Sequence, residues 1–463
     1  MILRIRSSGA GGIGGLHFAR VNSCKVFGPA FIVLLCLLLE GCTRQRVHEP
    51  ITLIYLDQRS MTPPYQKEYE RELQQFTQET GIRVKFLPSP ESAQEQLALW
   101  QELLATGVSG PDVYGIDVIW PGILGDDFID LKPYFGNEIP EYFPAIIKSY
   151  TVDNKLVAIP HGPDAGLLFY RTDLLREYGY GAPPSTWDEL ETMAARIQAG
   201  ERAKGKRQFW GFVWQGVATE ALTCNALEWQ ASEGGGRIIE DDKTISVNNP
   251  QAIRAWQRAA HWVGTISPPS EISYNEFDAM NVWSAGDAAF MRNWPGHYLL
   301  SQAAKSPIRN KFDVTLLPGG KGGRLGTLGG IGLGVSRFST HPREARELVR
   351  FLTRRDMELT RVLLLSDPPD REELYQLPEV QKQYPHFALL SQGFKTGVVS
   401  RPSNVAGKKY AEVSDAYIRA VHSVLTGEKG APEAATALEK ELVNITGYKK
   451  GAPSSGSAGS ARP

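Results

Sequence analysis

Strands and helices alternate at the start of this chain, and this alternation restricts its fold more than any other feature. Three short apolar runs, at residues 51–56, 82–87 and 112–116, have the length and composition of buried strands. Helical patterns at residues 65–81 and 93–106 separate them. This order predicts a parallel, doubly wound α/β sheet, in which ligands bind at the carboxyl ends of the strands.

An export signal precedes this pattern. A basic leader runs into an apolar segment over residues 26–39, which is too short for an ordinary membrane span. The segment resembles the signal of a bacterial lipoprotein, which implies a signal peptide at residues 1–41 and lipidation of Cys42. Glu40 stands where that pattern prefers a small or apolar residue, so an ordinary secretory signal and an uncleaved anchor remain alternatives.

The length of the chain predicts more than one lobe. Without the leader 463 − 41 = 422 residues remain, more than a single hydrophobic core usually serves. Later segments repeat the opening pattern, with strands expected at residues 209–213 and 312–317 and helices at 251–263 and 342–353. We therefore expect two lobes of similar construction.

Charge and cysteine content exclude several classes of protein. The 50 basic and 51 acidic residues balance without a run of like charge, so we expect no nucleic-acid partner. Only Cys224 remains outside the leader and Cys42, and we expect it to be a buried core residue. The eight histidines lack metal-ligand spacing, and we expect neither a metal nor a cofactor.

Four clusters carry a recognisable pattern. They lie, in this order, at residues 112–120, 159–171, 286–295 and 327–330. Together they resemble the extracellular solute-binding proteins of ABC importers, in the carbohydrate-binding family, and are most similar to its trehalose- and maltose-binding branch. The resemblance covers nearly all of residues 50–448.

This resemblance implies a two-lobed periplasmic-binding-protein fold, type II-like, in which each lobe is a doubly wound sheet and the ligand cleft lies between the lobes. The lobe boundaries that we expect are residues 50–163 with 317–358, residues 164–316 with 359–448, and a disordered tail at 449–463. The implied function is that of a monomeric, membrane-tethered, non-enzymatic receptor that delivers a di- or oligosaccharide to an ABC permease.

A sugar site needs acids and aromatic side chains. A carboxylate accepts hydrogen bonds from sugar hydroxyls, and the C–H face of a sugar ring packs on an aromatic ring. Asp117 follows a predicted strand, and Asp164 interrupts an apolar run. Both match ligand-binding acids of the family, and Trp294 matches its stacking tryptophan. A helix cap or hinge bond for Asp117 and a core position for Trp294 remain alternatives.

The resemblance also implies weaker candidates. Gly329 and Gly330 match backbone that approaches the sugar closely, although glycine pairs also form simple turns. Arg401 matches an arginine that reaches the ligand, with a surface arginine as the alternative. Trp120 and Glu220 complete the expected set of ligand contacts.

The sequence departs from these relatives at three positions. Gly162, Gly296 and Ile331 stand where trehalose- and maltose-binding relatives carry aromatic residues. The loss of three aromatic walls leaves one sugar ring poorly stacked or makes room for a different ligand.

Other functions would require different residue patterns. A glycoside hydrolase needs two carboxylates about 5 to 10 Å apart, and neither Asp117 nor Asp164 has a neighbouring acid in a motif. A receptor for a phosphate ester needs clustered cations, and one for a polyamine needs a ring of acids with aromatics. Neither excess is evident.

Overall fold

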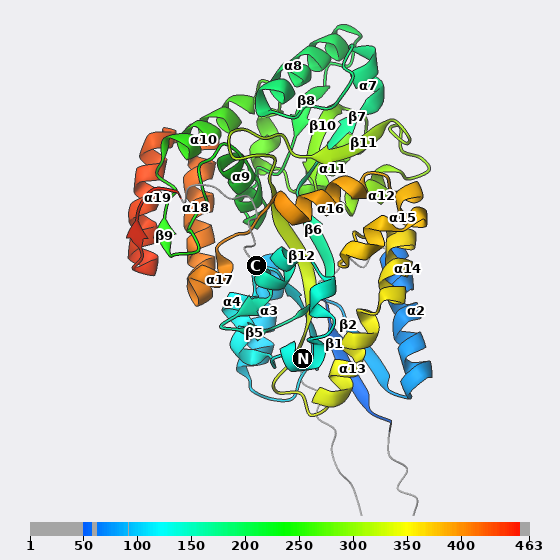
Figure 1. The fold of residues 1–463 in the computed structure, drawn as a ribbon. Coiled ribbons are helices and arrows are strands. Elements are labelled where there is room, and N and C mark those ends of the chain that lie inside the picture. The colour runs from blue at the N-terminus through cyan, green and yellow to red at the C-terminus, as the bar shows by residue number, and fades with distance from the viewer. Residues whose placement is uncertain (1–49, 58–62, 91, 454–463) are drawn as a thin grey trace, which may run out of the picture. The chain divides into compact units, whose positions relative to one another are not determined.

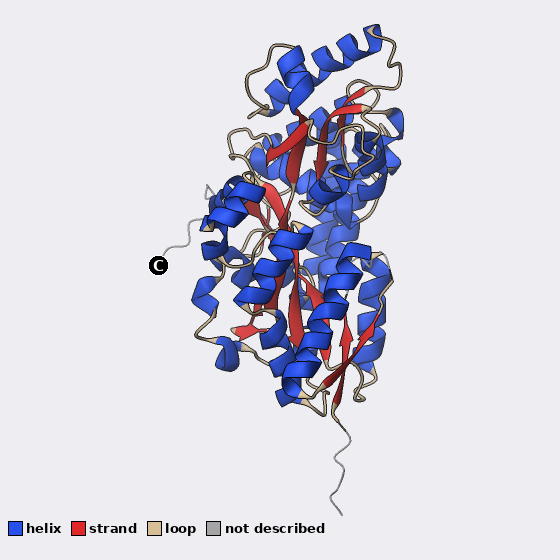
Figure 2. Ribbon diagram, turned by 90° about the vertical axis from the view of Figure 1, so that its right-hand side faces the viewer, coloured by secondary structure: helices blue, strands red, loops and turns tan. Residues whose placement is uncertain are grey.

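The computed structural model describes residues 50–57, 63–90 and 92–453, so Cys42 and the rest of the leader lie outside the described residues. Within them the strands form two main sheets, and helices pack on both sides of these sheets (Figures 1 and 2). No helix in this part of the chain is both long and apolar enough to cross a membrane.

The first sheet contains the predicted opening. Strand β1 (Thr52–Leu56) pairs in parallel with β2 (Arg83–Leu87) and with β3 (Val113–Asp117). The connecting helices α2 (Pro63–Thr80) and α3 (Ala93–Ala105) match the predicted ranges to within two residues. The parallel strand–helix alternation expected from the sequence is therefore confirmed.

Distant parts of the chain complete this sheet. The long strand β12 (Gly326–Val335) pairs antiparallel with β3 and with β6 (Ile159–Ala165), and in parallel with β13 (Val398–Val399). Figure 1 shows β6 and β12 side by side at the centre of the molecule, where both approach the second sheet.

The second sheet is mixed. Its order is β11 (Phe312–Leu316), β7 (Leu167–Arg171), β10 (Ala288–Asn293) and β8 (Trp210–Val213), and only β8 and β10 are parallel. It therefore differs from the opening part of the first sheet, in which β1 is parallel to both β2 and β3. The reason is that β7 continues from β6 through the single residue Gly166 and so enters the second sheet against the direction of β10.

Helices cover both sheets. Those of the first sheet include α4 (Pro121–Leu124), α6 (Pro144–Ser149), α13 (Pro342–Leu352) and α14 (Arg355–Leu365). Those of the second include α7 (Thr172–Glu177), α8 (Trp187–Ala203), α9 (Glu220–Ser232), α10 (Pro250–Trp262), α11 (Glu276–Ser284) and α12 (His297–Ser301). Helices α18 (Tyr410–Leu425) and α19 (Ala431–Thr446) pack outside these, against α9 and α10. Between these groups lie η4 (Glu372–Gln376), α15 (Pro378–Gln383), α16 (Phe387–Thr396) and α17 (Ser403–Ala406).

Sequence pattern explains why these helices pack. Helix α13 buries Ala345, Leu348, Val349 and Leu352, which lie on one face at helical spacing, and it exposes arginines on the other. Its Phe351 ring meets Phe76 of α2 edge-on at 5.3 Å. Burial of these side chains fixes α2 and α13 on the same side of the first sheet.

The contacts differ from the expected lobe boundaries in three places. Asp164 and Ala165 still belong to β6, and the 319–322 loop bonds to Ser185 and Ser232 of the second lobe. A boundary after residue 358 would cut α14, whose Arg361 pairs with Glu72 of α2. We therefore propose boundaries at Gly166, just before β12 and after α14.

The end of the described chain is also more ordered than expected. Lys449–Lys450 form strand β14, which pairs with β9 (Thr244–Ile245), and the Gly451 N–H donates to the Ile245 carbonyl at 3.0 Å. These backbone hydrogen bonds order residues that we expected to lie in a disordered tail. The expectation rested on polar side chains, whereas strand pairing uses backbone groups. Residues 454–463 lie outside the described residues.

Most tryptophans are core residues. Eight of the ten are buried, and only Trp210 and Trp294 keep partial exposure. Trp229 packs edge-on against Trp214 at 4.9 Å and Trp262 at 5.6 Å in the second lobe. Tryptophan content thus reflects core packing more than binding surface.

Cys224 is buried and free on α9. Burial raises the pKa of its thiol to about 12, which keeps it protonated and unreactive. The predicted core role is confirmed.

Candidate ligand-binding site

The first lobe contributes two carboxylates from strands on either side of β12. Asp164 of β6 is paired with Gly329, and Asp117, the last residue of β3, is paired with Ile331. The two predicted acids therefore flank the same short stretch of one strand. Neither is fully buried.

The second lobe contributes Trp294. It directly follows β10, whose last residue pairs with Leu167 where the chain enters the second sheet. A Cβ placed on Gly329 would lie 3.0 Å from Cζ3 of Trp294 and 3.3 Å from Cβ of Asp164. The indole ring and the acid thus lie close above Gly329, and a side chain at position 329 would require them to shift slightly. We name Asp164, Gly329 and Trp294 the β6–β12 seam.

Asp164 is held in a demanding electrostatic environment. Its Oδ1 accepts the Ala165 N–H at 3.0 Å. Burial raises the pKa of this carboxyl well above its usual range, and the negative charges of Asp367 and Asp117 raise it further, against the opposing effect of Arg292. A carboxylate whose charge is disfavoured by its surroundings is stabilised by any partner that donates hydrogen bonds to it.

Asp117 makes local hydrogen bonds and also remains partly exposed, so both the ligand contact and the structural role considered for it stay open. Its Oδ1 accepts the Ile119 N–H at 3.1 Å, which fixes the turn after β3. The same oxygen lies 3.8 Å from Nη2 of Arg401. Asp117 is therefore part of a turn and of an ion pair, and its partial exposure leaves it accessible.

Arg401 and Glu220 lie together, but in a network of their own. Arg401 is buried, and its Nη1 lies 2.9 Å from Oε1 of Glu220 while its Nη2 donates to the Leu328 carbonyl at 3.3 Å. Glu220 also accepts the hydroxyls of Tyr410 and, at 2.6 Å, of Ser414. Arg401 is thus not a surface arginine, and two of its three guanidinium nitrogens bond within the protein. We name five residues the Arg401 cluster: Asp117, Glu220, Arg401, Tyr410 and Ser414.

Gly330 meets backbone instead of open space. It has a φ of +116°, and a Cβ there would lie 2.6 Å from the Gly162 carbonyl oxygen. Gly162 has a φ of +117°. Both glycines are required where β6 and β12 approach each other irregularly, so strand pairing by itself accounts for them.

Trp120 lies in the core of the first lobe. Its side chain is 1% exposed and meets the Trp100 ring edge-on at 5.6 Å. In this structure a ligand has no access to the ring.

The structure adds residues that the sequence reasoning missed. The Tyr65 hydroxyl donates to Oδ1 of Asp367 at 2.6 Å, and both Asp370 oxygens accept the Gly162 N–H, at 2.9 and 3.1 Å. A Cβ on Gly296 would lie 3.8 Å from the Tyr65 hydroxyl. The run Asp367-Pro368-Pro369-Asp370, in which two prolines stiffen a loop between two acids, was the available signal.

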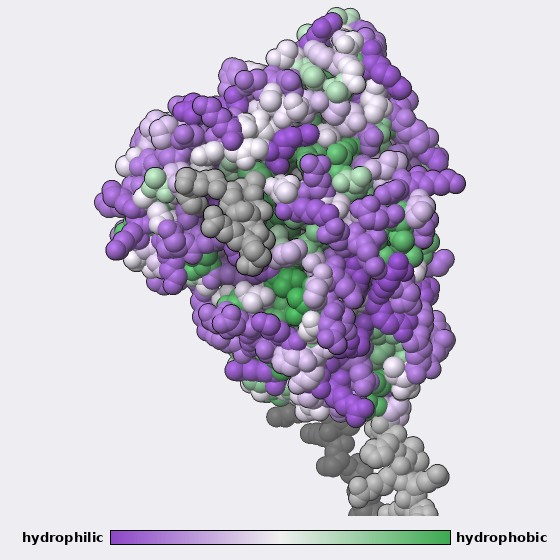
Figure 3. All heavy atoms as spheres, in the orientation of Figure 1, coloured by the Kyte–Doolittle hydropathy of each residue, from purple (hydrophilic) through white to green (hydrophobic). Residues whose placement is uncertain are grey.

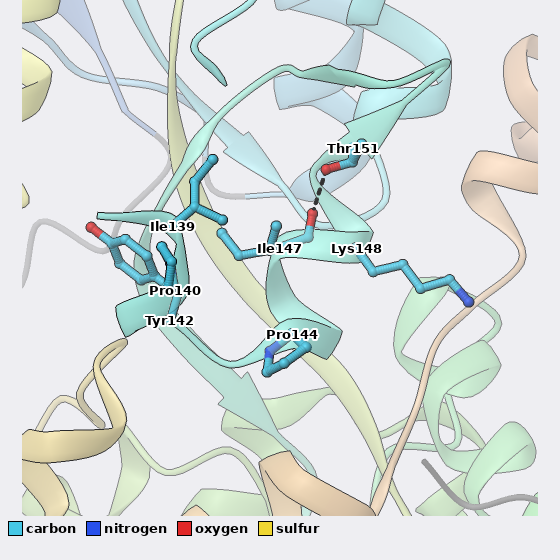
Figure 4. Close-up of a pocket in the computed structure, with 7 residues that line it drawn as sticks. All are labelled: Ile139, Pro140, Tyr142, Pro144, Ile147, Lys148 and Thr151. Carbon is cyan, nitrogen blue, oxygen red and sulfur yellow. Dashed lines mark hydrogen bonds between the residues drawn. The ribbon is translucent and has the colours of Figure 1, made fainter. Parts of the chain in front are cut away.

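A groove elsewhere on the first lobe lacks the chemistry of such a site. It has a volume of about 390 Å³ and is lined by Ile139, Pro140, Tyr142, Pro144, Ile147, Lys148 and Thr151 (Figure 4). None of the predicted ligand contacts lines it, and its walls are mostly apolar. On the face shown in Figure 3 hydrophilic side chains predominate, and hydrophobic ones gather in small clusters.

Comparison with known proteins decides the family. The model of the bacterial extracellular solute-binding proteins matches residues 60–358, and this stretch includes β3, β6, β10 and β12. The chain belongs to the family of bacterial extracellular solute-binding proteins. The family consists of exported receptors that serve transport and not of enzymes, so the glycoside hydrolase alternative is excluded.

Individual relatives agree with this assignment. The "Probable ABC transporter-binding protein" of Deinococcus radiodurans is 46% identical over 374 residues, which cover 80% of this chain and 89% of the relative. Among solved structures, maltose-bound MalE3 of T. maritima is 34% identical with a TM-score of 0.78, over 85% of this chain and all of that one.

More distant structures support the fold alone. The GacH receptor of Streptomyces glaucescens, solved unliganded and with acarbose, is 21% identical with a TM-score of 0.75, over 87% of this chain and all of that one. The two-lobed periplasmic-binding-protein fold expected from the sequence is therefore confirmed.

Proposed function

We propose that this solute-binding protein is a lipid-anchored sugar receptor, which binds a di- or oligosaccharide related to maltose or trehalose and delivers it, as a monomer, to an ABC permease. The β6–β12 seam is the observation that carries the proposal. An aromatic ring from one lobe stands beside a carboxyl group from the other, and this combination suits the C–H faces and hydroxyls of a sugar ring. Similarity to the maltose-bound MalE3 supports the same class of ligand.

The arginines near the site favour a neutral ligand over a phosphate ester. Arg401 is engaged by Glu220 and Asp117, and Arg292 forms a buried ion pair with Glu228. An anionic ligand would have to compete with these carboxylates. A sugar needs no such exchange, because its hydroxyls bond to the acids themselves.

The ligand contacts that we propose are Asp117, Asp164, Trp294 and the backbone at Gly329, together with Asp367 and Tyr65. Glu220 and Arg401 act mainly through the cluster that they form. The glycines at 162 and 296 leave fewer aromatic walls than the maltose- and trehalose-binding branch carries, and the hydroxyl and carboxyl of Tyr65 and Asp367 lie near one of these gaps. This arrangement favours a ligand rich in hydroxyls over one with extensive stacking.

A thermal-shift panel tests the ligand class. Purified protein is heated with maltose, trehalose, longer maltooligosaccharides, polyols, a sugar phosphate and spermidine. A ligand at a hundredfold excess over its Kd stabilises the folded state by about 2.7 kcal/mol. We expect the largest rise in melting temperature with a di- or oligosaccharide; a rise with the sugar phosphate or spermidine alone would reject the proposal.

Lipidation is tested separately. The Cys42→Ser variant should lose acyl label and leave the membrane fraction, because the acylated thiol is absent. A variant that still carries label and sediments with membranes would show that Cys42 is not the anchor.

A further inference from the structure

A buried ion pair lies directly behind the aromatic wall of the site. Arg292 of β10 and Glu228 of α9 are 1% and 0% exposed. Their contact is bidentate, with Nε to Oε2 at 2.9 Å and Nη2 to Oε1 at 2.5 Å. Gln215 adds a third bond by accepting from Nη1 at 3.1 Å. The guanidinium therefore has a fixed orientation.

The same guanidinium packs on Trp294. Its Cζ lies 4.2 Å from the centroid of the indole ring, within the range of a cation–π contact. One face of the ring is thus held by a cation that cannot move without breaking its bonds to Glu228 and Gln215.

Glu228 connects this support to the first lobe. Its Oε1 also accepts the backbone N–H of Thr327 at 3.0 Å, two residues before Gly329 on β12. The Thr327 hydroxyl donates to the Cys224 carbonyl of α9 at 2.9 Å. At Gly166, where β6 passes into β7, a Cβ would overlap Glu228 Oε1 and Arg292 Nη2. One ion pair thus touches the ring, the strand beneath it and the link between the lobes.

We propose that Arg292 is a positioning residue for ligand binding: with Glu228 it holds the Trp294 ring in register with Gly329 and Asp164 without touching the ligand. The inference rests on the proposed sugar-binding function of the seam. A buried ion pair is usually assigned a role in stability only, whereas we assign this one a role in positioning Trp294.

The test compares two equivalent substitutions in the second lobe. Arg292→Lys keeps the positive charge and loses the planar, bidentate group that covers the ring. Arg171→Lys is the matched control, because Arg171 is also buried and binds Asp173 through two bonds, at 2.7 and 2.8 Å, but stands at the far end of β7. With maltose as the probe in calorimetry, Arg292→Lys should weaken binding about tenfold and Arg171→Lys less than about twofold.

A double-mutant cycle separates positioning from general damage. In a Trp294→Leu background, Arg292→Lys should cost little further affinity, because the ring through which it acts is already gone. Equal losses in both backgrounds would overturn the proposal, as would equal losses in Arg292→Lys and Arg171→Lys. If Arg292→Lys does not fold, Glu228→Gln tests the same link from the other partner.

A ligand-free measurement keeps this test distinct from that of the proposed function. Protein labelled with 5-fluorotryptophan gives one ¹⁹F resonance per indole, and Trp294→Phe identifies that of Trp294. Arg292→Lys, or Glu228→Gln in its place, should shift or broaden this resonance and leave Trp210 unchanged. An unmoved Trp294 signal would reject the positioning role, whereas a moved signal with no maltose binding by the wild type would reject maltose as the ligand and leave the positioning role standing.

Discussion

The β6–β12 seam and the Arg401 cluster lie at the same junction between the lobes, yet their polar groups are in opposite states. In the cluster, Glu220 accepts from one guanidinium and two hydroxyls, and Arg401 bonds to a carboxylate and a backbone carbonyl. In the seam, Asp164 accepts one hydrogen bond from a neighbouring backbone N–H. The Glu220 carboxylate and two of the three guanidinium nitrogens of Arg401 bond within the protein, although Nε of Arg401 lacks a partner among the described residues. We propose that the seam keeps its bonding capacity for a ligand.

This difference separates residues that the sequence alone treats alike. Asp164 and Glu220 are both acids in the expected set of ligand contacts, but their surroundings differ. A carboxylate that already accepts several hydrogen bonds is stabilised little by a sugar hydroxyl. One whose charge is disfavoured by burial and that accepts few hydrogen bonds is stabilised much more. We therefore propose that, among these acids, the one with fewer existing hydrogen-bond partners is the ligand contact.

The largest effect should come from breaking the cluster. Arg401→Ala leaves Glu220 largely buried without its cation, and the loss of one partner of a buried pair costs about 3 to 5 kcal/mol of unfolding free energy. Urea denaturation followed by circular dichroism measures this. Adding Glu220→Gln removes the stranded charge and should recover part of the loss; a stability close to wild type in Arg401→Ala would show that the cluster does not hold the lobes.

Breaking the seam should affect binding more than stability. Asp164→Ala removes a charged acceptor for sugar hydroxyls and should cost about 1.5 to 3 kcal/mol of binding free energy, the range for hydrogen bonds to charged groups. Calorimetry with the sugar found by thermal shift measures the change. Wild-type affinity in this variant would place the ligand elsewhere.

The pH dependence of stability sharpens the same contrast. The pKa of Asp164 is raised in the folded protein, chiefly by burial, so folding opposes its ionisation. Below the unfolded pKa of about 3.9, Asp164 is protonated in both states and does not reduce folding stability. As the pH rises from about 3.9 to the raised folded pKa, ionisation in the unfolded state lowers the stability of the folded protein. The Asp164→Asn variant lacks this loss. Its stability relative to wild type should therefore increase over that interval, and a pH-independent difference would contradict the assigned environment.

Crowding the seam should have a smaller effect. Gly329→Ala places a methyl group 3.0 Å from the Trp294 ring, which should cost about 1 kcal/mol of folding stability, the low end of overpacking costs. The displacement of the ring should also weaken sugar binding. Gly334→Ala on the same strand is the control, because its Cβ would meet Phe128 and Ile116 in the first-lobe core. Both variants should lose stability, but only Gly329→Ala should lose affinity.

Much of this arrangement could be predicted from the sequence. Local patterns placed the opening strands and helices to within two residues, because apolar periodicity reports which face of an element is buried. Resemblance to a family supplied Asp164, Trp294 and Gly329 as a set. Neither source could show that Glu220 and Arg401 satisfy each other, because they are 181 residues apart and their contact depends on how α9 meets the segment before α17.

Other features were hidden for different physical reasons. Tyr65 and Asp367 are 302 residues apart, and their hydrogen bond exists only because α2 begins beside the loop that follows α14. Trp120 was a weaker candidate for ligand contact, but its buried ring packs edge-on against Trp100. Whether a side chain points into the core or toward the cleft depends on tertiary packing, and the local sequence does not reveal it.

The smallest predicted effect concerns the aromatic walls that this chain lacks. Gly296 has ordinary helical geometry, and its nearest atom within contact range is the Tyr65 hydroxyl at 3.8 Å, so a larger side chain has room to start there. Gly296→Phe restores one stacking face and should improve disaccharide affinity by about 0.5 to 1 kcal/mol, the usual worth of an aromatic contact beyond its area. Gly296→Ala, which adds no ring, is the control and should bind like the wild type. Improved binding of maltose in Gly296→Phe alone would show that the chain has the family's cleft with one wall removed. Weaker binding of the preferred ligand would instead show that this ligand occupies the space beside Tyr65 and Asp367. These two residues would then form a further, polar side of the binding site, with bonding capacity kept for the ligand as in the seam.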